Sequence, residues 1–241
     1  MDIHAIDTVS TTQRPFDSTT LHTFSIREPG SAITHGIAMV FALIGAIPLM
    51  RRAVTGGTVA WIAAFIFCAS MILLYGASTA FHTFDINPRV NTILKKADHM
   101  MISVFIAGSY TPICLLVLPE PTGLMLLAVV WGLALAGIII KAFFVFCPKW
   151  VSSILYIGMG WTCLLALGTI FRNMDPAGFA FLFVGGLIYT IGGVIYALKL
   201  PIFNAKHKNF GSHEVFHIFV MLGSLCHFVV MYFFVAGMAL H

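Results

Sequence analysis

Three histidines and an aspartate in this chain are spaced as metal ligands and a catalytic acid or base would be. His213 and His217 lie four residues apart in SHEVFH, a spacing that puts both imidazoles on one helix face, one turn apart. His82 ends the stretch STAFH and Asp98 ends KKAD. A zinc ion with three protein ligands keeps a fourth position open for water, whereas a structural zinc is usually closed by four. These residues therefore favour hydrolysis by a metal-activated water.

The rest of the chain is far more apolar than a soluble protein. Of its 241 residues 59% are hydrophobic and 9% charged, with a mean hydropathy of +0.97, against roughly 45–50% apolar and 25% charged residues in soluble domains. A helix crosses a bilayer with about 20 apolar residues. The chain predicts an all-α membrane protein, a bundle of seven transmembrane helices, in the windows 33–50, 59–82, 98–118, 122–143, 150–171, 177–200 and 213–237.

One polar segment precedes this apolar region. Residues 1–30 are rich in acidic and hydroxyl residues and lack the apolar core of a signal peptide, so we predict a polar N-terminal tail followed by one membrane domain over 31–241. The five cysteines are odd in number and include no Cys-x-x-Cys pair, which favours unpaired thiols. The net charge of +4 is carried mostly by the loops and tail and indicates no nucleic-acid partner.

The basic residues predict how the bundle is oriented. If the N-terminus is cytoplasmic, ten of the thirteen Lys and Arg residues fall on the cytoplasmic side and three, Arg51, Arg52 and Arg172, on the other. Cytoplasmic loops carry an excess of Lys and Arg. We therefore predict a cytoplasmic N-terminus and an extracytoplasmic C-terminus.

This topology brings the chemical residues to one membrane depth. The second helix ends, and the third and seventh begin, on the cytoplasmic side, which places His82, Asp98, His213 and His217 close to that face. A carboxylate within the membrane is costly unless it faces the interior and has a partner, so Asp98 is expected beside the metal-activated water. Ser78 lies one turn before His82, on the same face.

Two further histidines are expected outside this group. His99 directly follows Asp98 and is expected to point elsewhere, while His227 lies about 21 Å along the helix from His213 and is expected to form a buried hydrogen bond. Polar residues in membrane helices often join helices by hydrogen bonds. A single histidine would fit that role, but three histidines and an aspartate at one depth favour a metal.

Several short motifs together resemble a known family. EPGSAITHG at 28–36, STAFH at 78–82, KKAD at 95–98, AGSYTP at 107–112 and SHEVFH at 212–217 are similar to motifs of the hemolysin III proteins. These are the bacterial branch of the progestin and adipoQ receptor family, which includes the adiponectin receptors. The resemblance implies a multi-pass protein of the bacterial inner (plasma) membrane with zinc (Zn²⁺) bound by His82, His213 and His217, and with Asp98 and Ser78 beside it. It also implies a relation to the alkaline ceramidases, within a group proposed to be metal-dependent lipid amide hydrolases.

One position departs from the family pattern. The first motif of the family usually has Asn where this chain has Ser31; a helix cap is a role that Ser can also fill. Glu28 and His35, in the same motif, are further candidate site residues, and their alternative role is hydrogen bonding at the helix end.

Two function classes remain open. In the first, the protein is a zinc-dependent, ceramidase-like hydrolase of a lipid amide or ester that contributes to membrane lipid homeostasis, with Asp98 as general base and then acid and Ser78 as a hydrogen-bond donor. In the second, it is a non-enzymatic membrane sensor or regulator with a structural zinc.

A retinal-type pump would need a lysine in the last helix, which has none. Pore formation, which the family name suggests, is less favoured because the chain does not resemble a secreted toxin.

Overall fold

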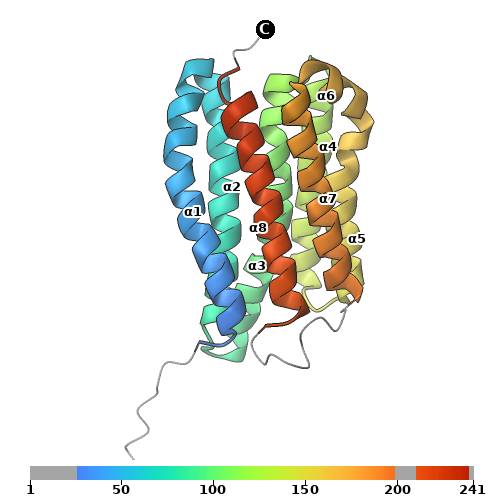
Figure 1. Ribbon diagram of the computed structural model, residues 1–241. Helices are drawn as coiled ribbons and strands as arrows, with labels where there is room; N and C mark the ends of the chain where they lie inside the picture. The colour runs from blue at the N-terminus through green and yellow to red at the C-terminus, as the bar shows by residue number, and fades with distance from the viewer. Residues whose placement is uncertain (1–25, 199–209, 239–241) are drawn as a thin grey trace, which may run out of the picture.

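The computed structural model of the protein describes residues 26–198 and 210–238, and every regular element in these two ranges is helical (Figure 1). Most of the predicted tail, the segment 199–209 with three of the basic residues, and the C-terminal His241 lie outside the described residues. The helices are α1 (Pro29–Ala53), α2 (Gly57–Thr83), α3 (Pro88–Pro112), α4 (Thr122–Phe143), α5 (Lys149–Gly160), α6 (Leu167–Asn173), α7 (Pro176–Leu198) and α8 (Ser212–Val230). Short 3₁₀ or π-helical turns adjoin them: η1 (Val54–Gly56), η2 (Ile113–Val117), η3 (Trp161–Ala166) and η4 (Met231–Val235).

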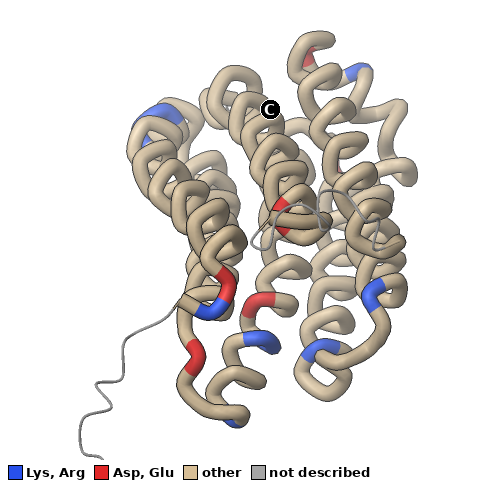
Figure 2. Tube along the Cα trace, turned by 60° about the horizontal axis from the view of Figure 1, so that its bottom comes forward, with Lys and Arg blue, Asp and Glu red and all other residues tan. Residues whose placement is uncertain are grey.

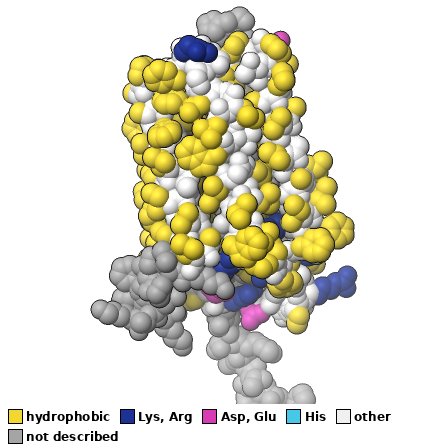
Figure 3. Space-filling model, turned by 90° about the vertical axis from the view of Figure 1, so that its right-hand side faces the viewer, with side chains coloured by type: hydrophobic (Ala, Val, Ile, Leu, Met, Phe, Trp, Pro, Cys, Tyr) yellow, Lys and Arg dark blue, Asp and Glu magenta, His cyan; other side chains and the backbone are white. Residues whose placement is uncertain are grey.

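Six apolar helical segments in the described part of the chain are long enough to cross a membrane. The first, Pro29–Thr83, has 55 residues and contains both α1 and α2, so the predicted windows 33–50 and 59–82 fall in this one segment. Many large hydrophobic side chains are exposed on the bundle surface, and they cover most of the face seen in Figure 3. The protein is therefore a multi-pass membrane protein, as predicted.

The helices lie side by side along one axis (Figure 1). α2 packs against α1 and α3, and α7 packs against α8. Successive long helices alternate in direction, so α2 ends where α1, α3 and α8 begin. The end of the bundle where these four termini meet is called the site end below.

α3 begins ten residues earlier than the predicted window at 98. Asn87 accepts a hydrogen bond from the Val90 amide at 2.9 Å, and Pro88 is the first helical residue. An Asn cap followed by Pro is a strong helix start. The polar first turns of α3 therefore extend beyond the apolar stretch, which is why hydropathy alone places the start too late.

Glycines on α7 allow close contact with α8. Gly178, Gly185 and Gly192 are seven residues apart and share one face of α7. A Cβ atom at Gly185 would lie 2.7 Å from Nδ1 of His227, so only a residue without a side chain fits there. Small residues at helix contacts in membranes allow this close approach. The three glycines face rings of α8 and η4, which belong to Phe234, His227 and Phe219.

The predicted window at 150–171 is not one regular helix. α5 ends at Gly160, η3 follows, and α6 continues to Asn173. The hydroxyl of Tyr110 on α3 donates to the Gly160 carbonyl and accepts a hydrogen bond from the Cys163 amide at 2.9 Å. A broken helix in a membrane needs neighbours to satisfy its freed backbone groups, and Tyr110 does this here.

Candidate metal centre

The structure brings together the three histidines that the sequence singles out. His82 lies in the last turn of α2, while His213 and His217 lie in the first two turns of α8. One potential ligand atom from each lies within 4.8 Å of the other two. His82 and His217 are buried and His213 is partly buried. The cluster could therefore hold a metal ion.

The hydrogen bonds of the rings indicate which nitrogens face the centre. Nε2 of His82 lies 3.4 Å from Nε2 of His213. The Thr34 hydroxyl donates to the carbonyls of Gly30 and Ser31, both at 3.0 Å. Its oxygen therefore accepts a hydrogen bond from Nδ1 of His217 at 3.2 Å. With the proton on Nδ1, Nε2 of His217 is unprotonated. Nδ1 of His213 is buried and has no hydrogen-bond partner in the described structure. Closely spaced imidazoles with unpaired nitrogens fit a metal ion.

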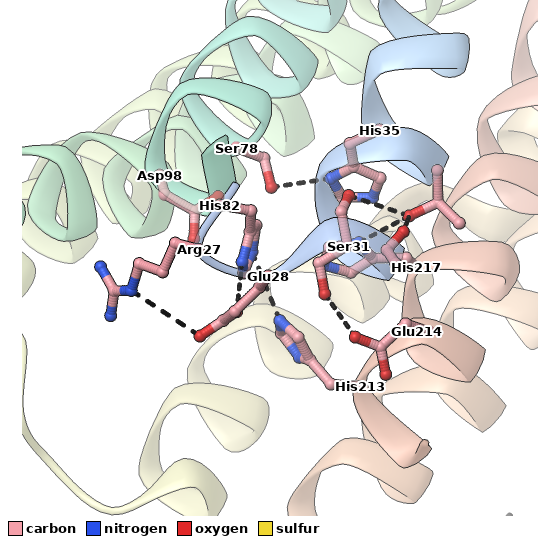
Figure 4. Close-up of polar contacts among 12 residues, drawn as sticks. Arg27, Glu28, Ser31, His35, Ser78, His82, Asp98, His213, Glu214 and His217 are labelled. Carbon is pink, nitrogen blue, oxygen red and sulfur yellow. Dashed lines mark hydrogen bonds and ion pairs between the residues drawn. The ribbon is translucent and has the colours of Figure 1, made fainter. Parts of the chain in front are cut away.

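Glu28 holds the first of these histidines in place. Its Oε2 lies 2.5 Å from Nδ1 of His82, and its amide donates to the His82 carbonyl at 2.9 Å (Figure 4). The hydrogen bond from His82 lowers the pKa of Glu28, against the raising effect of burial. A carboxylate that accepts the second ring proton of a ligating histidine fixes its orientation and raises its basicity. Glu28 and Arg27, whose amide donates to the Thr83 carbonyl at 3.3 Å, lie before the predicted domain start at 31 but are tied to α2.

Ser31 does not cap α1, contrary to the role suggested for it. The helix begins at Pro29, and Ser31 is its third residue. Its hydroxyl donates to Oε1 of Glu214 at 2.6 Å, while Oε2 of Glu214 accepts the Gly211 amide at 2.8 Å (Figure 4). The serine thus joins α1 to the start of α8, because at this depth in the helix its side chain faces the neighbouring helix.

Asp98 and Ser78 lie beside the histidine cluster, on α3 and α2. Asp98 is buried, and it lines the same polar end of the cavity as Ser78. Oγ of Ser78 also lies 2.8 Å from Nδ1 of His35. The His35 ring stacks on His217 with centroids 3.6 Å apart, which places His35 within the same polar group.

The expectation for His99 was wrong. Its Nδ1 lies 2.9 Å from the Lys95 carbonyl and 3.4 Å from Oδ2 of Asp98. The hydrogen bond to the Lys95 carbonyl, one turn earlier in α3, directs the His99 ring back along the helix. The ring therefore lies close to the side chain of Asp98. His227 behaves as expected: it is buried, and its Nδ1 donates to the Gly223 carbonyl at 2.9 Å.

A cavity of about 190 Å³ extends from this group into the bundle. Its polar end is lined by His35, Ser78, Asp98, His213 and His217. The remaining wall is mostly apolar and comes from α2, α3, η2, α5, η3, α6, α7 and α8. Because Phe179 and Ile170 also line it, the cavity extends from the site end most of the way along the helices.

The sequence alone did not indicate a role for Thr34. It lies three residues after Ser31 and six after Glu28, so all three project from neighbouring faces at the start of α1. The motif EPGSAITHG shows this helical spacing. The sequence did not show which residues of α2 and α8 these side chains contact.

Comparison with known proteins agrees with the geometry. The chain matches the family described as "Haemolysin-III related" over residues 23–228. It is 36% identical over 214 residues to Hemolysin-3 of Bacillus cereus, covering 88% of this chain and 93% of that protein. It is 37% identical over 213 residues to the Hemolysin-3 homolog of Bacillus subtilis (strain 168), covering 88% and 96%.

More distant similarity reaches animal proteins. The human monocyte to macrophage differentiation factor is 28% identical over 203 residues, covering 81% of this chain and 79% of that protein. The adiponectin receptor protein of Drosophila melanogaster is 25% identical over 181 residues, covering 67% of this chain and 40% of that receptor. A bundle of apolar helices with a histidine cluster at one end is thus accompanied by full-length similarity to bacterial hemolysin III proteins, and the chain belongs to the haemolysin-III-related family.

Proposed function

We propose that the protein is a zinc-dependent hydrolase that cleaves an amide or ester bond of a membrane lipid and contributes to membrane lipid homeostasis. One observation carries this proposal: His213 and His217 of the histidine cluster, a buried carboxylate and a hydroxyl line the polar end of a mostly apolar cavity. A purely structural metal site would need no such cavity.

The three imidazoles would hold the metal. Three nitrogen ligands suit a catalytic zinc, which keeps one position open. Zinc, when bound, supplies an activated water at neutral pH. Glu28 orients His82, and Thr34 orients His217, so two of the three rings are held before any metal binds.

Asp98 is the proposed general base and then general acid. Its carboxylate lies at the polar end of the cavity, with Oδ2 3.4 Å from Nδ1 of His99. In that position it can take a proton from the attacking water and pass it to the leaving group. Ser78 also borders the cavity, where its hydroxyl can turn to donate to the developing oxyanion.

The apolar wall of the cavity fits a hydrocarbon chain. Side chains such as Ile102, Phe105, Leu182 and Val220 line it beyond the polar end. Burial of apolar surface favours binding by roughly 25 cal/mol per Å². A lipid whose scissile carbonyl lies beside Asp98 would place its chain along this wall.

We also propose seven membrane crossings with a cytoplasmic N-terminus. α1 and α2 have 25 and 27 residues, or roughly 38 and 40 Å at 1.5 Å per residue, so each exceeds the ~30 Å hydrocarbon core. Most of the basic residues in the described part of the chain lie at the site end, which this topology places in the cytoplasm (Figure 2). Arg52, at the opposite end, donates to the Phe233 carbonyl at 3.5 Å and lies over the Tyr232 ring, so it has a structural role there.

A sensor with a structural zinc is the alternative. The observation in its favour is that the metal ligands come from α2 and α8, so a bound ion would join two helices distant in sequence. Such a protein would keep its function without hydrolysing a lipid.

The test is hydrolysis by the purified protein. Incubation with a membrane lipid extract should release fatty acid, detected by mass spectrometry, and a chelator should stop the release. Asp98→Asn should keep the fold and the zinc but lose nearly all activity, whereas Asp85→Asn, an exposed carboxylate outside the cavity, should not. If wild-type zinc-loaded protein releases nothing, or Asp98→Asn is fully active, the proposed chemistry is wrong.

A further inference from the structure

A lysine is buried near the end of α4, away from the histidine cluster. The side chain of Lys141 is only 1% exposed. Its Nζ donates to Oγ of Ser152 at 2.5 Å and to Sγ of Cys147 at 3.0 Å. Sγ of Cys147 lies 3.6 Å from Oγ of Ser152. These three residues form a closed group, called the Lys141 cluster below.

The cluster contains a cation but no carboxylate. Among the described residues, no Asp or Glu oxygen lies within 4 Å of the Lys141 ammonium. A buried charge is costly unless it is paired. Of its two hydrogen-bond partners, only a thiol can lose its proton near neutral pH, since free cysteine has a pKa of about 8.5. A thiolate at Cys147 would balance the charge of Lys141.

The surroundings of Cys147 also favour a thiolate. The residue is partly exposed in the segment between α4 and α5, two positions before the 12-residue helix α5 begins, and helix N-termini stabilise anions. Burial raises the pKa of Cys147, but the hydrogen bonds from Lys141 and Ser152 outweigh it, and the pKa lies below its ordinary value. The other titratable groups that interact with it are Lys95 on α3, Tyr156 on α5 and Tyr196 on α7.

The other four cysteines differ from Cys147. All five are free, but Cys68 and Cys114 are buried, and Cys163 and Cys226 lie within membrane-spanning segments. Among the hydrogen bonds of the described residues, only Cys147 receives one from a lysine at its sulfur. Thiolate character and access together decide which cysteine reacts.

We propose that Cys147 is a modification site, a reactive thiolate that is oxidised by hydroperoxides. Its sulfur attacks the terminal peroxide oxygen, an S–O bond forms, and the O–O bond breaks. The sulfur is oxidised by two electrons to a sulfenic acid, and the peroxide is reduced to an alkoxide. Lys141 gives its proton to the alkoxide, which leaves as an alcohol.

This reaction converts the ion pair of the buried Lys141 and the partly exposed Cys147 into two neutral groups. After the reaction, Lys141 and the sulfenic acid of Cys147 are both uncharged. Their burial therefore carries no cost of an unpaired charge. Ser152, the third member of the cluster, also lines the cavity. Oxidation would therefore alter the hydrogen bonds of a side chain in the cavity wall, next to the proposed lipid.

The first experiment compares the five cysteines within the wild-type protein. Purified protein is treated with cumene hydroperoxide in the presence of dimedone, which traps sulfenic acids, and the peptides are measured by mass spectrometry. Cys147 should be labelled ~10-fold faster than Cys163 or Cys226. Equal or slower labelling of Cys147 would overturn the proposal without reference to any variant.

A second experiment tests the role of the lysine. In Lys141→Met, iodoacetamide should alkylate Cys147 with a midpoint at higher pH than in the wild type, because the thiolate has lost its cation. Lys141→Arg should restore the lower midpoint, and Lys96→Met, which removes a lysine outside the cluster, should not shift it. An unchanged midpoint in folded Lys141→Met would show that the lysine does not activate the thiol. Zinc content should stay at the wild-type level in all three variants.

Discussion

Oε2 of Glu28 lies 2.5 Å from Nδ1 of His82, a residue 54 positions later in the chain. Glu28, the residue before α1, thereby orients a candidate metal ligand at the end of α2. This contact explains why the site includes the start of α1, although all three candidate metal ligands come from α2 and α8.

Glu28→Gln should weaken metal binding without removing it. The amide oxygen can still accept a hydrogen bond from Nδ1 of His82, but the negative charge that raises the basicity of the ring is lost. Such partners typically change metal affinity by ~10–100-fold. Competition with a chromogenic chelator measures the affinity, and Glu120→Gln, at an exposed position, is the control. Equal zinc affinity in both variants would assign Glu28 a packing role only.

His213→Ala and His217→Ala should each abolish stoichiometric zinc. Either change leaves two of the three ligand atoms that lie within 4.8 Å of one another. Metal analysis of the purified variants checks this, and His227→Gln, about 15 Å further along α8 than His217, should keep the metal. Full zinc occupancy in the double variant His213→Ala/His217→Ala would show that the metal ligands are other residues.

Leu182→Trp should reduce hydrolysis of long-chain lipids while zinc content is unchanged. Leu182 lines the cavity from α7, so a larger side chain there would occupy space proposed for the chain. Leu187→Trp, on the same helix but 40% exposed, is the matched control. Product release measured against chain length should decline most for the longest chains; the same decline in Leu187→Trp would remove the cavity as the cause.

Gly185→Ala should destabilise the bundle, while its neighbour Gly186 should tolerate the same change. A Cβ at Gly185 would lie 2.7 to 3.0 Å from atoms of His227 and Cys226, whereas one at Gly186 meets nothing within 4 Å. Overpacking typically costs about 1–3 kcal/mol. Thermal unfolding in detergent compares the two variants. Equal unfolding midpoints would mean that α7 and α8 accommodate the added methyl group at Gly185 without loss of stability.

A reporter fused after His241 should behave as extracytoplasmic. That residue lies outside the described part of the chain, so this prediction rests on the distribution of basic residues and on seven crossings. Paired fusions to alkaline phosphatase and green fluorescent protein measure it. Fluorescence without phosphatase activity would reverse the topology and move the site to the other face.

The sequence by itself determined the helical membrane class and the residues of the histidine cluster. Hydropathy along the chain records which segments are apolar, and the spacing of His213 and His217 records which side chains share a helix face. Both are local properties. The alternation of helix direction then placed His82 and Asp98 at the same end as that pair.

Only the tertiary structure decided which side chains complete the site. Ser31 contacts Glu214, and Thr34 contacts His217, only when α1 and α8 pack against each other. Each of these two contacts joins residues 183 positions apart, and the cavity is lined by residues of nine elements. Hydropathy and spacing describe single helices, whereas these contacts depend on how helices pack, which small residues such as Gly185 control through close approach.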